Sequence, residues 1–260
     1  MAKKIAIVIQ KGGVGKTTTA TNIAAALAQT GKRTLLIDLD QQANATTGLD
    51  VDPQSVPHTL NDLFERADVP PSAATVETVV PGLYLLAGSP DLSKTETGMA
   101  FQRANPSATD DPRLSLRGLV AELDGLYDFI IMDTPPSLNY MTINALAAAD
   151  ELVIPAAASA YSTDALTRTL EAYENAVSTY NPSLRLRGIL VTRFDSRTIA
   201  AESVFDDIGS AYKDLVIPQL IVEATAVNQA ALLNQPVVLY KPESPAAQGY
   251  KRVAEMFING

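Results

Sequence analysis

The sequence predicts an α/β fold: a single doubly wound domain over residues 1–260, with a mostly parallel central sheet and helices on both faces. Short apolar runs alternate with helical stretches along the chain, which is typical of repeated strand–helix–strand units. A glycine-rich turn joins the first apolar run to the first helical stretch, an arrangement that suits phosphate binding. With 260 residues, 47% of them hydrophobic, the chain is long enough to bury one sizeable core.

The individual elements follow from apolar runs bounded by turn residues. The predicted strands, in chain order, are 5–9, 34–39, 83–87, 129–132, 151–155, 188–192 and 214–217. Helical spacing of apolar residues predicts helices between most of them, including 17–29, 114–123, 141–149 and 162–180. Segments 50–80 and 88–113 are polar, contain prolines and have weak periodicity, so we expect surface elaborations there and no domain boundary.

Composition excludes several classes of protein. The chain has no cysteine and one histidine, which rules out disulfides, thiolate metal sites and an ordinary nucleophilic triad built on histidine and cysteine. No apolar run approaches the roughly 20 residues of a membrane span. The net charge of −9 argues against a surface coated in basic residues for nucleic acid. We therefore expect a cytoplasmic protein.

The turn after the first strand predicts a nucleotide site. It consists of Lys11, Gly12, Gly13, Val14, Gly15, Lys16, Thr17 and Thr18. Backbone N–H groups of such a loop, together with the helix N-terminus, bind phosphate. Lys16 can reach the β- and γ-phosphates, and the Thr17 hydroxyl can ligate Mg²⁺. Lys11 has little room to turn onto its own nucleotide, so we expect it to point out of the subunit.

Carboxylates follow two of the predicted strands. Asp38 and Asp40 stand at the end of the second strand, and their alternation puts them on one face. Asp133 follows the fourth strand and precedes two prolines. In a parallel sheet these ends lie beside the phosphate loop. We expect Asp40 to act at the reaction centre, Asp133 to lie near Mg²⁺, and Asp38 to belong to the same site.

Together these motifs resemble the ParA/MinD family of deviant Walker-A ATPases, and most of all the small, Soj-like ParA partition ATPases. The resemblance runs nearly end to end through the loop at 10–19, the Asp motif at 36–46, Asp133 to Ser137, and the segment 236–240 with the final helix. Lys11 stands where the family has its characteristic lysine. Positions 9, 41 and 43, which are Ile9, Gln41 and Ala43, depart from the family pattern.

The resemblance implies a weak ATPase that uses ATP and Mg²⁺. It implies that ATP-bound monomers form a sandwich homodimer in which Lys11 reaches the partner's nucleotide. Lys16 would hold phosphate, Thr17 would ligate Mg²⁺, Asp40 would position the water and support the metal site, and Asp133 would support Mg²⁺. A ParB-like or McdB-like partner would stimulate hydrolysis. The turn that begins at Thr192 and the segment after Val222 would lie near the base.

The resemblance also implies non-specific DNA binding on the nucleoid, where relatives commonly use two arginines. Glu223 and Ala226 fill those positions here. Other basic residues would have to neutralise phosphates in their place. The candidates are Arg185, Arg187, Arg193, Arg197, Lys241, Lys251 and Arg252.

Several alternatives stay open at this point. An McdA-like ATPase would position a protein organelle, and the sequence hardly separates that role from DNA partition. A MinD-like ATPase would cycle on membranes, but the final stretch is too short for a clear basic amphipathic helix, so we expect no membrane binding. A small-molecule ligase is disfavoured by Lys11. No helix-turn-helix domain precedes the loop in this sequence, so we do not expect operator-specific repression.

Overall fold

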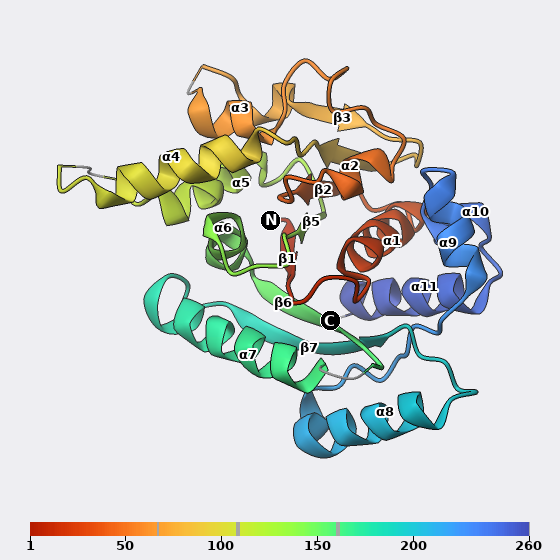
Figure 1. Cartoon of the computed structure of the whole chain (residues 1–260). Coiled ribbons are helices and arrows are strands. Elements are labelled where there is room, and N and C mark those ends of the chain that lie inside the picture. The colour runs from red at the N-terminus through yellow and green to blue at the C-terminus, as the bar shows by residue number, and fades with distance from the viewer. Residues whose placement is uncertain (67, 108–109, 160–161, 260) are drawn as a thin grey trace.

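A computed structural model describes residues 1–66, 68–107, 110–159 and 162–259. Within these residues one sheet has the strand order β3-β4-β2-β5-β1-β6-β7 (Figure 1). The strands are β1 (Lys3–Ile7), β2 (Thr34–Asp38), β3 (Thr75–Glu77), β4 (Leu83–Leu86), β5 (Phe129–Asp133), β6 (Glu151–Ala157) and β7 (Arg185–Thr192). All neighbours pair in parallel except β3, which runs antiparallel to β4 at the edge. The predicted α/β fold is confirmed.

Helices cover both faces of the sheet, as Figure 1 shows. One face carries α1 (Lys16–Gln29), α2 (Asn44–Thr47), α9 (Thr225–Leu232), α10 (Val237–Tyr240) and α11 (Pro245–Ile258). The other carries α3 (Leu60–Glu65), α4 (Leu92–Ala104), α5 (Ser115–Leu123), α6 (Tyr140–Ala148), α7 (Ser162–Thr179) and α8 (Ile199–Tyr212). Short 3₁₀ turns lie at η1 (Pro71–Ala73), η2 (Pro112–Leu114) and η3 (Lys213–Leu215).

The two hydrophobic cores arise from the alternation of side chains along each strand. In β1, Ala6 packs into the core beneath α4 to α7, whereas Ile5 and Ile7 pack against α1 and α11. Because both faces are covered, the central strands are apolar on both sides, and every residue of β2 and β5 is buried. None of the helices in the described residues is long and apolar enough to cross a membrane.

One predicted strand is wrong. Residues 214–217 do not form a strand; they contain the end of η3 and a single bridge between Val216 and Ile189 of β7. Ile217 donates one backbone hydrogen bond to Ile189, and then Pro218, which has no N–H group, follows. The apolar run therefore lies beside β7 without extending the sheet.

The two segments expected to be surface elaborations contain regular structure that the sequence pattern did not reveal. Segment 88–113 includes the helix α4, whose buried side chains are only Leu92, Thr95 and Met99, while Phe101 is 74% exposed. Such a narrow apolar stripe gives a weak periodic signal. Segment 50–80 includes α3 and the three-residue edge strand β3.

The sheet order brings the candidate residues to one edge. β5 lies between β1 and β2, and its last residue, Asp133, is in register with Ile7 of β1 and Asp38 of β2. The loop after β1, the residues after β2 and the end of β5 therefore meet at the carboxyl ends of three neighbouring strands.

Candidate nucleotide-binding site

The glycine loop, which we define as residues 11–15, has a backbone that only glycine adopts readily. Gly13 and Gly15 have φ values of 74° and 82°, in the left-handed region. Gly15 is the N-cap of α1, and no side chain caps the first N–H groups of that helix. These N–H groups are thus available to a ligand, and the helix dipole favours an anion there.

The preceding residue is tied to the other side of the sheet. The Gln10 backbone N–H donates to the Thr169 hydroxyl of α7 at 3.2 Å, and its side-chain amide donates to the Arg168 carbonyl at 3.0 Å. Lys11 is half-buried at the start of the loop. The loop is therefore fixed where it leaves β1.

Lys16 lies inside the site rather than on its surface. Its side chain is 7% exposed, and its ammonium donates to the backbone carbonyl of Thr134. The same ammonium is 3.9 Å from Oδ1 of Asp133. The Thr134 hydroxyl donates to the Ile7 carbonyl at 2.9 Å, which holds the end of β5 against β1. This places a cation directly beneath the glycine loop.

Asp133 shows that the site suits a hydrated metal ion. Its carboxylate is fully buried, and neither oxygen accepts a hydrogen bond from the described residues. Burial raises the pKa of this carboxyl, while Lys16 lowers it. A buried carboxylate that accepts no hydrogen bond is costly even beside a cation, and it fits water molecules bound to a metal ion. The residues present therefore fit Mg²⁺.

The rest of the donor set agrees with magnesium. No group of three or more acidic, histidine or cysteine side chains gathers in the described parts of the chain. Mg²⁺ at phosphate sites commonly takes one or two protein ligands and completes its shell with phosphate and water. Thr17, half-buried in the first turn of α1, is the hydroxyl available here.

The two aspartates after β2 have different surroundings. Asp40 is 5% exposed, and its Oδ1 accepts from the Gln42 backbone N–H at 3.0 Å. Asp38 is fully buried and accepts from Thr46 N, Thr46 Oγ1 and Asp40 N at 2.9, 2.8 and 3.2 Å. Burial, and then Asp133, raise the pKa of Asp38 to about 7. Its contacts are those of a residue that holds segment 40–46 in place.

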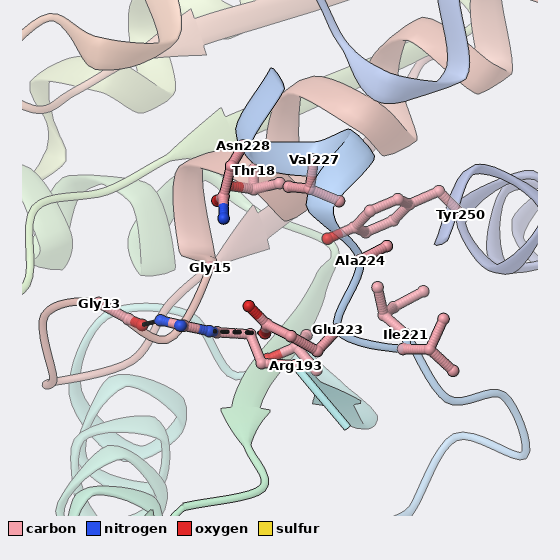
Figure 2. A pocket seen from close by; sticks show the side chains of 12 residues that line it. Gly13, Gly15, Thr18, Arg193, Ile221, Glu223, Ala224, Val227, Asn228 and Tyr250 are labelled. Carbon is pink, nitrogen blue, oxygen red and sulfur yellow. Dashed lines mark hydrogen bonds and ion pairs between the residues drawn. The ribbon is translucent and has the colours of Figure 1, made fainter. Parts of the chain in front are cut away.

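A pocket opens next to the glycine loop (Figure 2). It is lined by Gly13, Gly15, Thr18, Thr192, Arg193, Ile221, Val222, Glu223, Ala224, Val227, Asn228 and Tyr250. One wall is apolar, formed by Ile221, Val222, Ala224 and Val227, and suits a planar base. The Thr192 hydroxyl donates to the Val14 carbonyl at 2.8 Å. Thr192 and the segment after Val222 thus lie together beside the loop; their contact with a base stays a prediction.

Two lining residues were not anticipated as site residues. Tyr250 of α11 is 2% exposed, and burial raises its pKa to about 12. Asn228 of α9 points toward the space above Gly15 in Figure 2. Neither belongs to a motif, and only the packing of α11 against α1, and of α9 against α10, brings them to the loop.

The comparisons with known proteins agree with this site. A family model described as an AAA domain matches residues 2–186. The chain is 39% identical over 254 residues to the chromosome-partitioning ATPase Soj of Thermus thermophilus. The aligned region covers 97% of this chain and 94% of the relative. It is 34% identical over 255 residues to the chromosome partitioning protein ParA of Caulobacter vibrioides. That alignment covers 98% of this chain and 93% of the relative. The chain belongs to the ParA/MinD family of P-loop ATPases.

A solved structure within this fold carries the relevant ligands. Cobyrinic acid a,c-diamide synthase from Mycobacterium smegmatis, with bound ATP analog and magnesium, superposes with a TM-score of 0.84 at 31% identity. The match covers 100% of this chain and 95% of the other. Nucleotide and magnesium binding are thus established for the fold to which this ParA/MinD family member belongs.

The basic residues considered for DNA binding do not form one face. Arg185 begins β7, and Arg187 donates to the Met256 carbonyl at 2.7 Å, whereas Arg193 follows the last residue of the strand. An eight-residue strand separates its ends by about 23 Å. Arg185 and Arg193 therefore lie near opposite ends of β7, and DNA contact by these arginines stays a prediction.

Three of the remaining candidates lie on the nucleotide side. Arg197 and Lys241 line a hollow that adjoins the pocket, and Arg252 lines the next hollow along. Arg197 is paired with Asp195 at 2.8 Å, and Lys251 donates to the Pro242 carbonyl at 3.2 Å. Among these remaining candidates, the exposed cations on the nucleotide side are thus Arg197, Lys241 and Arg252.

Proposed function

We propose that this protein is a ParA-type ATPase that segregates DNA by an ATP-dependent cycle of dimerisation and DNA binding. One observation carries the proposal. The carboxylate of Asp133, whose oxygens accept no hydrogen bond, and the ammonium of Lys16 lie together under the glycine loop, where Mg²⁺ would serve the carboxylate and the phosphates would serve the ammonium. The names of the Thermus and Caulobacter relatives support chromosome partition as the role.

Each residue has a task in this proposal. Residues 12–18 bind the phosphates, and Lys16 leaves the Thr134 carbonyl to hold the β- and γ-phosphates. Thr17 and Asp133 hold Mg²⁺, directly or through water, and the ion when bound neutralises phosphate charge. Asp40 orients the attacking water. Lys11 reaches the nucleotide of a second subunit in a sandwich homodimer.

The cycle follows from these tasks. With ATP bound the chain dimerises and binds DNA without sequence preference, through phosphate neutralisation by surface cations such as Arg197, Lys241 and Arg252. Intrinsic hydrolysis is slow, and a ParB-like partner stimulates it. The dimer then separates and leaves the nucleoid. An McdB-like partner would instead couple the same cycle to a protein organelle.

The first experiment tests the nucleotide site. Lys16→Ala removes the buried cation and is expected to abolish binding of ATP and ADP, measured by titration calorimetry with Mg²⁺. Lys94→Ala is the matched control, because Lys94 is 79% exposed on α4 and its ion pair with Asp91 lies outside the site. Unchanged ATP affinity of Lys16→Ala would refute the assignment.

The second experiment tests the cycle. Asp40→Ala is expected to trap an ATP-bound dimer, seen by light scattering, that binds DNA only with ATP and loses the DNA steeply as salt rises. A monomer in the presence of ATP would contradict the proposed switch. Dimers that do not bind DNA would indicate that the ATP-bound dimer assembles on another surface. Binding of the same variant to anionic lipid vesicles would then favour a MinD-like role.

A further inference from the structure

Arg193 makes two bonds that connect opposite sides of the nucleotide pocket. Its Nη1 donates to the Gly13 carbonyl in the glycine loop at 2.8 Å. Its Nε donates to Oε2 of Glu223, in the segment before α9, at 3.0 Å. Figure 2 shows both interactions along one edge of the pocket. The side chain is 54% exposed, yet both its Nε and its Nη1 donate hydrogen bonds.

The bond to Gly13 has a consequence for phosphate binding. In a planar trans peptide the C=O and the following N–H point in opposite directions. Arg193 fixes the Gly13 carbonyl, so the Val14 N–H points away from Arg193. Thr192 does the same to the next peptide, because its hydroxyl donates to the Val14 carbonyl at 2.8 Å. Two consecutive side chains thus orient two consecutive N–H groups of the glycine loop.

Glu223 is itself held by the backbone around it. Its N–H donates to the Phe194 carbonyl at 2.9 Å, and the Phe194 N–H donates to the Ile221 carbonyl at 3.0 Å. The segment that carries the acidic anchor is therefore hydrogen-bonded to the residue that follows Arg193. The backbone of Arg193 has a φ of 51°, a left-handed conformation that is unfavourable for arginine. The turn keeps it nonetheless, and this directs the side chain across the pocket edge.

We propose that Arg193 is a positioning residue of the nucleotide site: bonded to Glu223, it fixes the glycine loop in its phosphate-binding shape and slows the release of bound nucleotide. This inference rests on the proposed function, since it requires that the pocket binds ATP and ADP. It assigns to Arg193 a role within the subunit, in place of the DNA contact considered from the sequence. A charge-assisted bond at a half-exposed site corresponds to about three- to tenfold in release rate.

Stopped-flow displacement of fluorescent N-methylanthraniloyl-ADP by excess ADP, with Mg²⁺ and without DNA, measures the release rate. Arg193→Ala is expected to release the nucleotide about three- to tenfold faster than wild type. Arg193→Lys, with one ammonium for two acceptors, is expected to lie between the two. Arg66→Ala is the matched control, since Arg66 is 50% exposed and pairs with Asp68 at 3.2 Å away from the pocket.

Arg193→Gly separates positioning from fold stability. Glycine relieves the left-handed backbone and removes the side chain, so this variant is expected to melt no lower than Arg193→Ala yet to release ADP as fast. Recovery of the wild-type rate in Arg193→Gly would overturn the inference, as would an unchanged rate in Arg193→Ala. If the wild-type chain binds no nucleotide, the proposed function fails and this inference fails with it; binding with unchanged release refutes this inference alone.

Discussion

Asp38→Asn replaces a buried carboxylate by a neutral side chain of the same shape. The Asp38 oxygens accept three hydrogen bonds, from the backbone and hydroxyl of Thr46 and from the Asp40 N–H. Burial and the neighbouring Asp133 raise the pKa of Asp38 from 3.8 to about 7. We therefore expect the substitution to change how the stability of the protein depends on pH.

The sign follows from proton binding. Because its native pKa exceeds the unfolded value, Asp38 binds more protons in the native state between pH 3.8 and about 7. Its contribution is complete below that window and is lost as the pH rises through it. The interval corresponds to at most about 4 kcal/mol of unfolding free energy. Asparagine must turn its NH₂ group toward one backbone donor, which costs about 1–3 kcal/mol at every pH.

The variant should consequently gain stability relative to wild type as the pH rises from 5.5 to 8, and at pH 8 it should be at least as stable as wild type. Urea unfolding followed by circular dichroism measures this, with EDTA and no nucleotide, since the chain has no tryptophan. Asp124→Asn is the control. The Ala2 N–H lowers the pKa of Asp124, so that residue stays ionised throughout and its curve should run parallel to wild type. A parallel curve for Asp38→Asn would refute the reasoning.

Two further substitutions test the packing around the site. Gly88→Ala places a Cβ 2.8 Å from the Asp38 carbonyl oxygen, and we expect it to lower the unfolding free energy by about 2–3 kcal/mol. Gly98→Ala is the control: its Cβ would lie in open space, so it should raise the unfolding free energy by up to about 1 kcal/mol. Arg187→Ala removes the bond to the Met256 carbonyl and should cost about 1–2 kcal/mol in urea unfolding while leaving DNA affinity per folded molecule unchanged. A stable Gly88→Ala, or weaker DNA binding by folded Arg187→Ala, would contradict these expectations.

Most of the central sheet could be predicted because its signal is local. The runs that form β2, β4, β5 and β6 are apolar on both faces and end at turn residues, and such short runs are typical of buried strands in a parallel sheet. The misread run at 214–217 is equally apolar. Its failure to pair depends on Pro218 and on what β7 offers at that edge, neither of which is a property of the run itself.

Some features of the candidate site likewise depend only on local sequence, and others depend on how the elements pack. The sequence by itself determined the glycine loop, because everything that a phosphate-binding loop needs lies within eight residues. It needs glycines where φ is positive, and a lysine and a threonine at fixed spacing after them. The sequence also determined that Asp133 ends a strand. The tertiary structure decided that Asp133 has no donor for its oxygens and lies 3.9 Å from Lys16, since this depends on β5 lying between β1 and β2.

The basic residues show why such decisions lie beyond the sequence. Arg187 lies on β7 and Arg193, six positions later, directly follows that strand. Arg187 packs on α11, whereas Arg193 crosses the pocket edge to Glu223, thirty residues away. Chain spacing sets which residues can be neighbours only within one element. Between elements, the neighbours of a charge are set by how strands and helices pack, and those neighbours decide whether it binds phosphate, backbone or another charge.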